Sequence, residues 1–434
     1  MKIIFAIDPW IYRDLVGDQL YTLENIFIPS IKALSEYGHD VKLLIGEDLA
    51  DVLLLKNISI PCKLHVISLK SLYNIYNNHY EAHKLQYKEK STALQKEKLK
   101  KIIFQELDCW YPDVIISFTT PVSVWKELYQ KSLSLQFENG IFSRSPYPYL
   151  CQLDPFGFLG KSYPYVFSKE LKNTAITKKQ KDRIFKLKKI YKEEIFDKYN
   201  PVNKKELIDY PGQKIVLVPL SYNGVVINDL ASKYKSQLDF LLEVIYKTPK
   251  DVIILFTKHS LQITGGIPSE TELYLLRKFP NLRYDKKFDH YAFCSQWLTP
   301  LVDGIITINS TIAYHGAFWD KKVFTLGNCE VNVVATSSNI NSIDKYLNQN
   351  KKYNSKSYNV IYHLLTRYCF PIKYFFDPIW LTKRFEKMID SKKAGTLDTS
   401  FTGMPLIDDE DCIFDLLVSE SPAMKNNYTP RTRT

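Results

Sequence analysis

Short runs of Val and Ile recur along the chain and alternate with segments in which apolar residues have helical spacing. Clear examples are KIIFAI at 2–7, DVIISF at 113–118, KIVLVP at 214–219 and DVIILFT at 251–257. Nearly uncharged, β-branched runs of this length are typical of strands that are buried on both faces of a parallel sheet. The helical segments between them supply the crossovers that such a sheet requires. The pattern therefore predicts an α/β fold with doubly wound, mostly parallel sheets.

The runs form two groups, and a chain of 434 residues is too long for one ordinary core. We expect a first Rossmann-like domain at 1–200 and a second at 213–375. The polar stretch between them is bracketed by Pro201, Pro211 and Gly212, as in a linker. A late helix is expected at 376–390. Residues 391–434 lack periodicity and are expected to be mostly a flexible tail, with one short helix at 411–418.

The net charge of +11 suits phosphate-bearing substrates, a polyanion or an anionic membrane face. Lysines concentrate at 84–101 and 178–192, which either form solvated helix faces or contact anionic lipid or charged glycan. No motif that reads DNA or RNA accompanies them, so nucleic acid is not an expected partner. No apolar run approaches the ~20 residues that span a bilayer.

The start of the chain, MKIIFAIDPW, is interrupted too early by Asp8 and Pro9 for a signal peptide. We therefore expect a cytoplasmic protein, whose basic helices allow peripheral contact with the cytoplasmic face of the inner membrane. Seven scattered Cys without a C-x-x-C pair predict neither a disulfide framework nor a zinc site, and fit a reducing compartment. Neither a metal nor a cofactor is expected.

The first candidate site is Gln136-Phe137-Glu138-Asn139-Gly140, which follows the predicted strand at 134–137. A carboxylate at the carboxyl end of a strand, followed by a Gly turn, faces the ligand side of an open α/β sheet. Glu138 is therefore a candidate acid/base residue. The alternative is an ordinary turn, in which Glu138 caps the next segment.

The second candidate site is Lys258-His259 with Ser260, at the end of the strand DVIILFT. A Lys and a His at such a position can hold phosphate oxygens, and a His can deliver a proton to a leaving group near neutral pH. The alternative is an ordinary exposed strand end.

The third candidate site is Asn309-Ser310-Thr311, between the strand at 302–308 and the predicted helix at 310–319. Hydroxyls at the start of a helix cap it, and the same position also binds anions, so the two interpretations are compatible. His315, one turn into this helix, either contacts the nucleotide or only packs against its neighbours.

These three segments together resemble the signatures of bacterial transferases that use CMP-activated acidic sugars. QFENG resembles their acidic-Gly motif, KHS their His-Pro motif and NST their Ser-Ser/Thr motif. The runs ITINSTIAYHGAFWDKKVFTLG and VLVPLSYNGVVINDLASKYKSQLDFL resemble stretches of capsule enzymes. The chain thus resembles GT-B glycosyltransferases, and within them the retaining β-Kdo transferases of capsule and O-antigen assembly. The resemblance covers residues 136–327 in patches.

The resemblance implies a fold of two Rossmann-like domains that face a cleft, and transfer of an acidic sugar from a CMP-sugar to a glycan or glycolipid acceptor. The donor would be CMP-Kdo, where Kdo is 3-deoxy-D-manno-octulosonic acid. It implies that Glu138 is the acid/base residue and that Lys258 and His259 contact the phosphate and the sugar carboxylate. Gln136, Asn309, Ser310, Thr311 and His315 would contribute to substrate or nucleotide binding.

The nucleophile of the family is an Asp. Counting from VPLS places it near Gly224, whereas counting back from Ser232 brings Asp229 into range, so Asp229 is the candidate. Without such an Asp the enzyme would be inverting or would use another donor.

Two other functions stay open. A GT-B transferase that uses a UDP- or GDP-sugar would bind a diphosphate at the third site. More Gly would then be expected near that site, and the whole chain has only 15. A catalytically inactive GT-B module would bind glycan without transferring it.

Overall fold

The computed structural model describes residues 1–7, 16–118, 121–209, 211–221, 226–259, 266–349, 355–425 and 428–432. The chain forms two compact units. Unit 1 comprises Met1–Asn139, Cys151–Phe158 and Ile372–Pro405, and unit 2 comprises Gly140–Leu150, Leu159–Pro371 and Leu406–Thr434.

The sheet of unit 1 has the strand order β6-β5-β4-β1-β2-β3. Every pairing is parallel except that of β5 with β6, which is antiparallel. The strands are β1 (Lys2–Ile7), β2 (Asp40–Gly46), β3 (Lys63–Ile67), β4 (Val114–Phe118), β5 (Leu133–Asn139) and β6 (Leu150–Asp154).

Both faces of this sheet are buried. On one face the rings of Phe5 and Phe137 pack with Phe27 of the π-helical turn Leu23–Phe27 and with Phe375, at centroid distances of 5.0–6.2 Å. The other face packs against α6 (Ala93–Glu106) and α7 (Val122–Leu128), through a cluster that includes Trp125. Burial on both faces explains why these strands are nearly continuous apolar runs in the sequence.

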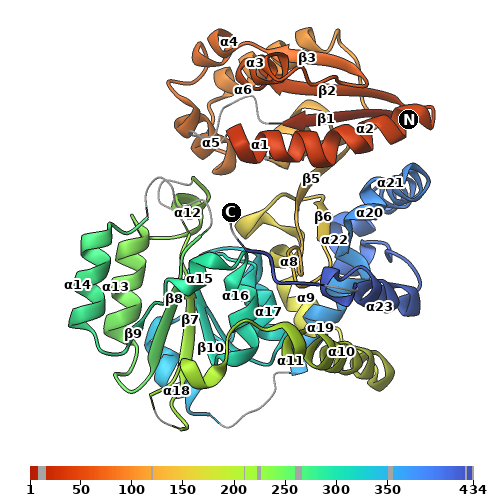
Figure 1. Ribbon diagram of the computed structural model, residues 1–434. Helices are drawn as coiled ribbons and strands as arrows, with labels where there is room; N and C mark the ends of the chain where they lie inside the picture. The colour runs from red at the N-terminus through yellow and green to blue at the C-terminus, as the bar shows by residue number, and fades with distance from the viewer. Residues whose placement is uncertain are drawn as a thin grey trace. The chain divides into compact units, whose positions relative to one another are not determined.

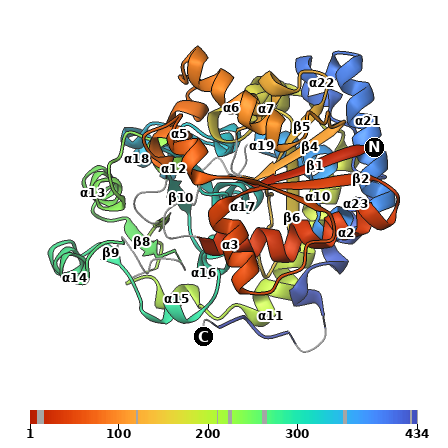
Figure 2. The same ribbon diagram turned by 90° about the horizontal axis from the view of Figure 1, so that it is seen from above.

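The sheet of unit 2 has five strands, all parallel, in the order β11-β10-β7-β8-β9 (Figure 1). They are β7 (Ile215–Pro219), β8 (Ile253–Thr257), β9 (Leu282–Arg283), β10 (Gly304–Thr307) and β11 (Lys322–Thr325). The crossovers include α13 (Gln237–Lys247), α14 (Ser269–Lys278), α16 (Cys294–Leu298) and α17 (Ile312–Phe318), several of which are labelled in Figure 2.

The predicted fold class is confirmed: the chain is an α/β protein with two parallel-rich, Rossmann-like sheets. The described part of the chain contains no helix that is both long and apolar enough to cross a membrane.

The compact units divide the chain at other places than the expected boundaries at 200 and 213. The basic helix α10 (Lys178–Tyr191) was expected in the first domain but belongs to unit 2. The reason is its apolar face, since Tyr191 is fully buried and its hydroxyl donates a hydrogen bond to the carbonyl of Leu417, 2.6 Å away. Conversely, the late helix α21 (Pro378–Lys393) belongs to unit 1.

The expectation of a mostly flexible tail at 391–434 is corrected by the structure. The segment contains α22 (Thr396–Thr399) and α23 (Glu410–Ser419), the latter close to the short helix predicted at 411–418. Its apolar side chains are too widely spaced to give a periodic signal, yet they reach the core. The buried ones include Leu397, Phe401, Met404, Ile413 and Leu417.

The loop between β5 and β6 belongs to unit 2, where it is held by aromatic side chains. Phe142 stacks on Tyr147 at 4.6 Å, and both rings meet His315 of α17 edge-to-face. The indole nitrogen of Trp319 donates a 2.6 Å hydrogen bond to the Tyr147 hydroxyl. Because Phe142 and Tyr147 are fully buried, these contacts fix the loop on α17.

We predict that Tyr147→Phe lowers the free energy of unfolding by about 1–3 kcal/mol, because the buried indole N–H of Trp319 loses its acceptor. Urea denaturation followed by circular dichroism measures the change. Tyr246→Phe is the matched control, because Tyr246 is 66% exposed and its loss should leave stability unchanged. Equal stability of the two variants would contradict the proposed role of the hydrogen bond.

Candidate functional site

Two of the predicted sites lie at one edge of the unit 2 sheet. In this sheet β8 and β10 flank β7 and run parallel to it, so the three strands end at the same edge. Lys258 and His259 follow β8, and Asn309–Thr311 follow β10. Two strand spacings separate the segments by roughly 10 Å. Ser260 lies outside the described residues, as do residues 222–225 after β7.

Lys258 is held by neighbours from two other elements. Its ammonium nitrogen lies 2.7 Å from Oε2 of Glu272 on α14 and 4.2 Å from the ring centroid of Tyr284. The Tyr284 ring stacks in turn on Phe256 of β8. An incoming anion would therefore share the ammonium with Glu272, which reduces what Lys258 alone contributes to binding.

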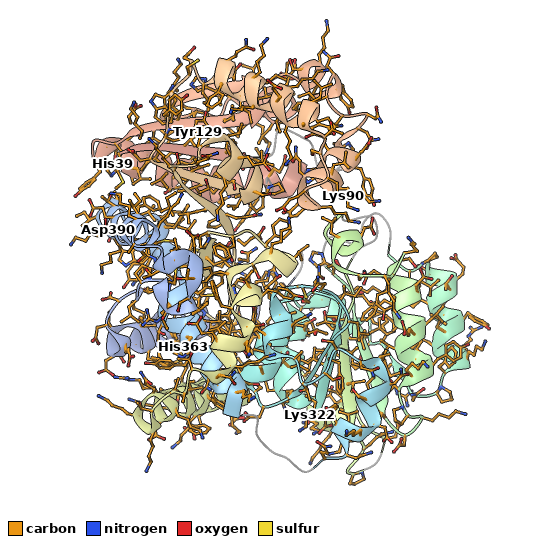
Figure 3. The ribbon with its side chains drawn as sticks, turned by 180° about the vertical axis from the view of Figure 1, so that it is seen from behind. His39, Lys90, Tyr129, Lys322, His363 and Asp390 are labelled. Carbon is orange, nitrogen blue, oxygen red and sulfur yellow. The ribbon has the colours of Figure 1, made fainter. Side chains whose placement is uncertain are left out.

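Two other histidines have roles in packing and hydrogen bonding rather than at this edge. In unit 1, Nδ1 of His39 lies 3.0 Å from the terminal amino group of Met1, and its Nε2 lies 2.7 Å from the Thr382 hydroxyl. In unit 2, Nε2 of His363 lies 3.2 Å from the carbonyl oxygen of Thr174. Both are labelled in Figure 3. Burial lowers the pKa of each, so both favour the neutral form.

Ser310 has the capping role that the sequence allowed. Its hydroxyl accepts a 3.4 Å hydrogen bond from the amide of Ile312, and its own amide donates to Oγ1 of Thr307. The helix α17 has seven residues and is shorter than the predicted 310–319, so its dipole is correspondingly small. The side chains of Asn309 and Thr311 are half-buried, and Thr311 makes no side-chain capping bond.

His315 lies in the core rather than at the edge. Its side chain is 1% exposed and packs edge-to-face against the rings of both Phe142 and Tyr147. Burial, with a smaller contribution from the charge of Arg144, lowers the pKa of His315 to about 3. We therefore correct the expectation that His315 contacts a nucleotide: the helical spacing that placed it one turn in also points it at the aromatic loop.

Asp229 belongs to the short helix α12 (Val226–Ala231), which follows β7. The carbonyl of Ala231 accepts a 2.6 Å hydrogen bond from the amide of Asn328, which comes after β11. This bond ties α12 to the carboxyl edge of the sheet. Asp229 is half-buried, and the next helix, α13, begins at Gln237.

Gln136 and Glu138 lie on β5 in unit 1. The strand continues through Asn139, so Glu138 is its second-last residue and lies opposite Gln152. The prediction that Glu138 follows the strand is therefore wrong. Gln136 is fully buried opposite Asp154, and its amide has no hydrogen-bond partner among the described residues. Its burial excludes direct contact with a substrate in this conformation.

Sequence reasoning missed the polar partners on β6. The carboxylate of Asp154 is fully buried and accepts hydrogen bonds from the amides of Phe156 and Gly157, at 2.7 and 2.9 Å. Gln152 and Asp154 face Glu138 and Gln136 across the antiparallel pair, which makes one polar strip. The signal was present as Asp-Pro-Phe-Gly, a turn that follows an alternating strand.

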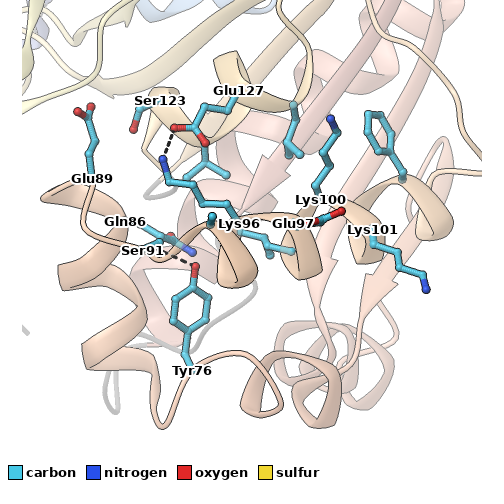
Figure 4. A pocket seen from close by; sticks show the side chains of 15 residues that line it. Tyr76, Gln86, Glu89, Ser91, Lys96, Glu97, Lys100, Lys101, Ser123 and Glu127 are labelled. Carbon is cyan, nitrogen blue, oxygen red and sulfur yellow. Dashed lines mark hydrogen bonds and ion pairs between the residues drawn. The ribbon is translucent and has the colours of Figure 1, made fainter.

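A cavity of about 600 Å³ lies in unit 1 between α6, α7 and the chain around Tyr76–Ser91 (Figure 4). Its size suits a small organic ligand. Lys96 pairs with Glu127 at 2.6 Å, and the lining holds three lysines and three glutamates, so its charge favours neither anions nor cations. None of the predicted site residues lines it. No group of His, Cys, Asp or Glu within the described residues is arranged to hold a metal ion.

We predict that His315 makes the folded protein less stable as the pH falls. Its folded pKa of about 3 lies below the unfolded value of 6.5, so the unfolded state binds the proton more tightly. The contribution is present above pH 6.5 and is lost as the pH falls toward 3. When the pH is lowered from 7 to 5, the free energy of unfolding should therefore fall by about 2 kcal/mol more in wild type than in His315→Leu. In urea titrations the exposed His290→Gln should behave like wild type, and an unchanged slope in His315→Leu would refute the assignment.

No family model and no curated protein matches the chain. Among solved structures, it is similar to the KpsC β-Kdo 2,7 transferase of Thermosulfurimonas dismutans, at 13% identity over 87% of this chain and 99% of that one, with a TM-score of 0.41. The KpsC β-Kdo 2,4 transferase of the same organism is 14% identical over 58% of this chain and 79% of that one, with a TM-score of 0.38. MnaA of S. aureus, in a co-structure with UDP, is 14% identical over 92% of this chain and 99% of that one, with a TM-score of 0.34. These likenesses are distant, so the function must come from the residues of the chain itself.

Proposed function

We propose that the protein is a glycosyltransferase that moves an acidic sugar, Kdo, from CMP-Kdo to a glycan or glycolipid acceptor in the synthesis of bacterial surface polysaccharide. The observation that supports this most is the common edge of Lys258-His259 and Asn309-Ser310-Thr311, on either side of β7. Ligands of open parallel sheets bind at this edge. The sequence resemblance supplies the identity of the donor.

The chemistry fits such a donor. The bond between the anomeric carbon and the phosphate oxygen breaks, and its electron pair stays on CMP, where negative charge grows. Lys258 and the hydroxyls of Ser310 and Thr311 would stabilise that charge, and His259 would donate a hydrogen bond or a proton to it. The acceptor hydroxyl forms the new bond to the anomeric carbon and gives its proton to Glu138. In a retaining reaction Asp229 would first form a covalent sugar ester.

The basic helices are proposed to contribute to location rather than to chemistry. Exposed lysines lie on α6 and α10, which overlap the two lysine-rich segments of the sequence. They would bring the enzyme to the anionic cytoplasmic face of the inner membrane, where a lipid-linked acceptor is found.

A transferase that uses a UDP- or GDP-sugar and an inactive glycan-binding module are the competing functions. The same edge would hold a diphosphate in the first case. In the second case a nucleotide would bind weakly or not at all.

We predict that CMP raises the melting temperature more than UDP or GDP does, since CMP at one hundred times its Kd adds about 2.7 kcal/mol of stability. A nucleotide panel in a thermal-shift assay measures this. His259→Ala should reduce both the CMP shift and the rate of transfer, and Ser310→Ala should reduce the shift less because backbone donors remain. A shift with UDP or GDP alone would refute the donor, and no shift with any nucleotide would favour the inactive module.

We predict that Glu138→Gln keeps near-normal affinity for CMP but slows transfer by roughly 10²–10⁴, the usual effect of losing an acid/base group. Asp229→Asn should abolish a covalent sugar adduct, which mass spectrometry of the intact protein with CMP-Kdo detects. Glu127→Gln is the matched control, because it makes the same change at a glutamate that lines the separate cavity. Full activity of Glu138→Gln would rule out its role, and an α-linked product would show inversion.

A further inference from the structure

Arg144 is a half-buried cation to which the structure gives no carboxylate. Among the described residues none forms an ion pair with it, and its guanidinium carbon lies 5.7 Å from the ring centroid of Phe293. Arg183 and Arg283, also of unit 2, are paired with Asp411 and Asp209 at 2.9 and 2.7 Å. A partly desolvated guanidinium without a counter-ion is costly, so a bound anion would be favourable there.

A chain of neighbouring residues connects Arg144 to both predicted phosphate-binding segments. Phe293 stands two residues before Ser295, whose hydroxyl lies 2.7 Å from that of Thr257, the last residue of β8. Lys258 and His259 follow directly. On the other side, the loop of Arg144 is fixed to α17, the helix that follows Asn309–Thr311.

The surroundings of Arg144 hold it in a defined position. Tyr147, three residues along, is fully buried and hydrogen-bonded to Trp319, and the amide of Tyr147 donates a 3.1 Å hydrogen bond to the carbonyl of Arg144. Phe293 adopts the left-handed conformation with φ 59°, which is uncommon for a residue with a large side chain. A strained residue that presents its ring to a cation fits a binding position that is formed in advance of the ligand.

We propose that Arg144 binds an anionic group of the donor, either the phosphate or the sugar carboxylate, at the carboxyl edge of the unit 2 sheet. The planar guanidinium can donate two parallel hydrogen bonds to either group, which Lys258, shared with Glu272, cannot do. The identity of the donor rests on the proposed function, whereas the need for an anion rests on Arg144 and its neighbours.

The test is calorimetric titration of wild type, Arg144→Gln and Arg144→Lys with cytidine, CMP and CMP-Kdo. Arg144→Gln should weaken binding by roughly 10- to 100-fold, the usual effect of losing a charge-assisted pair. Weaker binding of CMP with cytidine unchanged identifies the phosphate. Normal CMP with weaker CMP-Kdo identifies the carboxylate. Arg144→Lys should lie between, because it keeps the charge and loses the fork.

Arg283→Gln is the matched control, since it removes the same charge from the same unit at β9. Normal binding of every ligand by Arg144→Gln, or an equal loss in Arg283→Gln, would overturn the inference. If the melting temperature of Arg144→Gln shows that this variant does not fold like wild type, binding by Arg144→Lys is judged by the same criteria. If wild type binds UDP or GDP instead of CMP, the proposed donor is wrong, and the same comparison with that nucleotide decides the role of Arg144. A wild-type chain that binds no nucleotide overturns both proposals.

Discussion

The parallel pairing of β7 with β8 and β10 determines where chemistry is available in unit 2. Parallel strands must be joined by crossovers, so the segments after their carboxyl ends all emerge at one edge. The register places Pro219 opposite Thr257 and Gly304 opposite Val216, which brings the strand ends to a common level. Residues separated by about fifty positions in the sequence, His259 and Asn309, therefore belong to one surface. Every functional argument about unit 2 depends on this pairing.

The electrostatics of this edge are less simple than its lysine and histidine imply. Lys258 is neutralised in part by Glu272, and His315, which the sequence offered as a second histidine, is buried and neutral. The positive charge that an anion would meet therefore comes from Lys258 in part and from Arg144, which arrives from the loop after β5. An arginine inside a Pro- and Tyr-rich loop gives no local signal, since its importance depends on where the aromatic residues around it are buried.

Sequence patterns predicted the fold well where they were strong and continuous. KIVLVP and DVIILFT became β7 and β8 almost at the predicted bounds, because runs of buried β-branched residues have few alternatives. The tail and the domain boundary could not be predicted in this way. The packing of Tyr191 against Leu417 joins residues more than two hundred positions apart, and nothing local records it. Likewise, Glu138 was expected just after a strand but lies within β5, and its polar neighbours on β6 depend on an antiparallel pairing that periodicity does not reveal.

The glycines of unit 2 bear on the choice of donor. Diphosphate sites commonly use glycine so that backbone amides can approach the ligand. Among the described residues near this edge, glycine has another use: a Cβ at Gly316 would lie 2.6 Å from Cδ1 of Ile305, and one at Gly327 would lie 2.5 Å from the carbonyl oxygen of Ile308. These glycines allow α17 and the chain after β11 to pack closely on β10. The groups proposed to bind anions there are instead side chains, namely those of Arg144, Lys258, His259 and Thr311. Side chains on separate segments would suit one phosphate and one carboxylate held apart, as in the proposed CMP-linked acidic sugar, better than two adjoining phosphates.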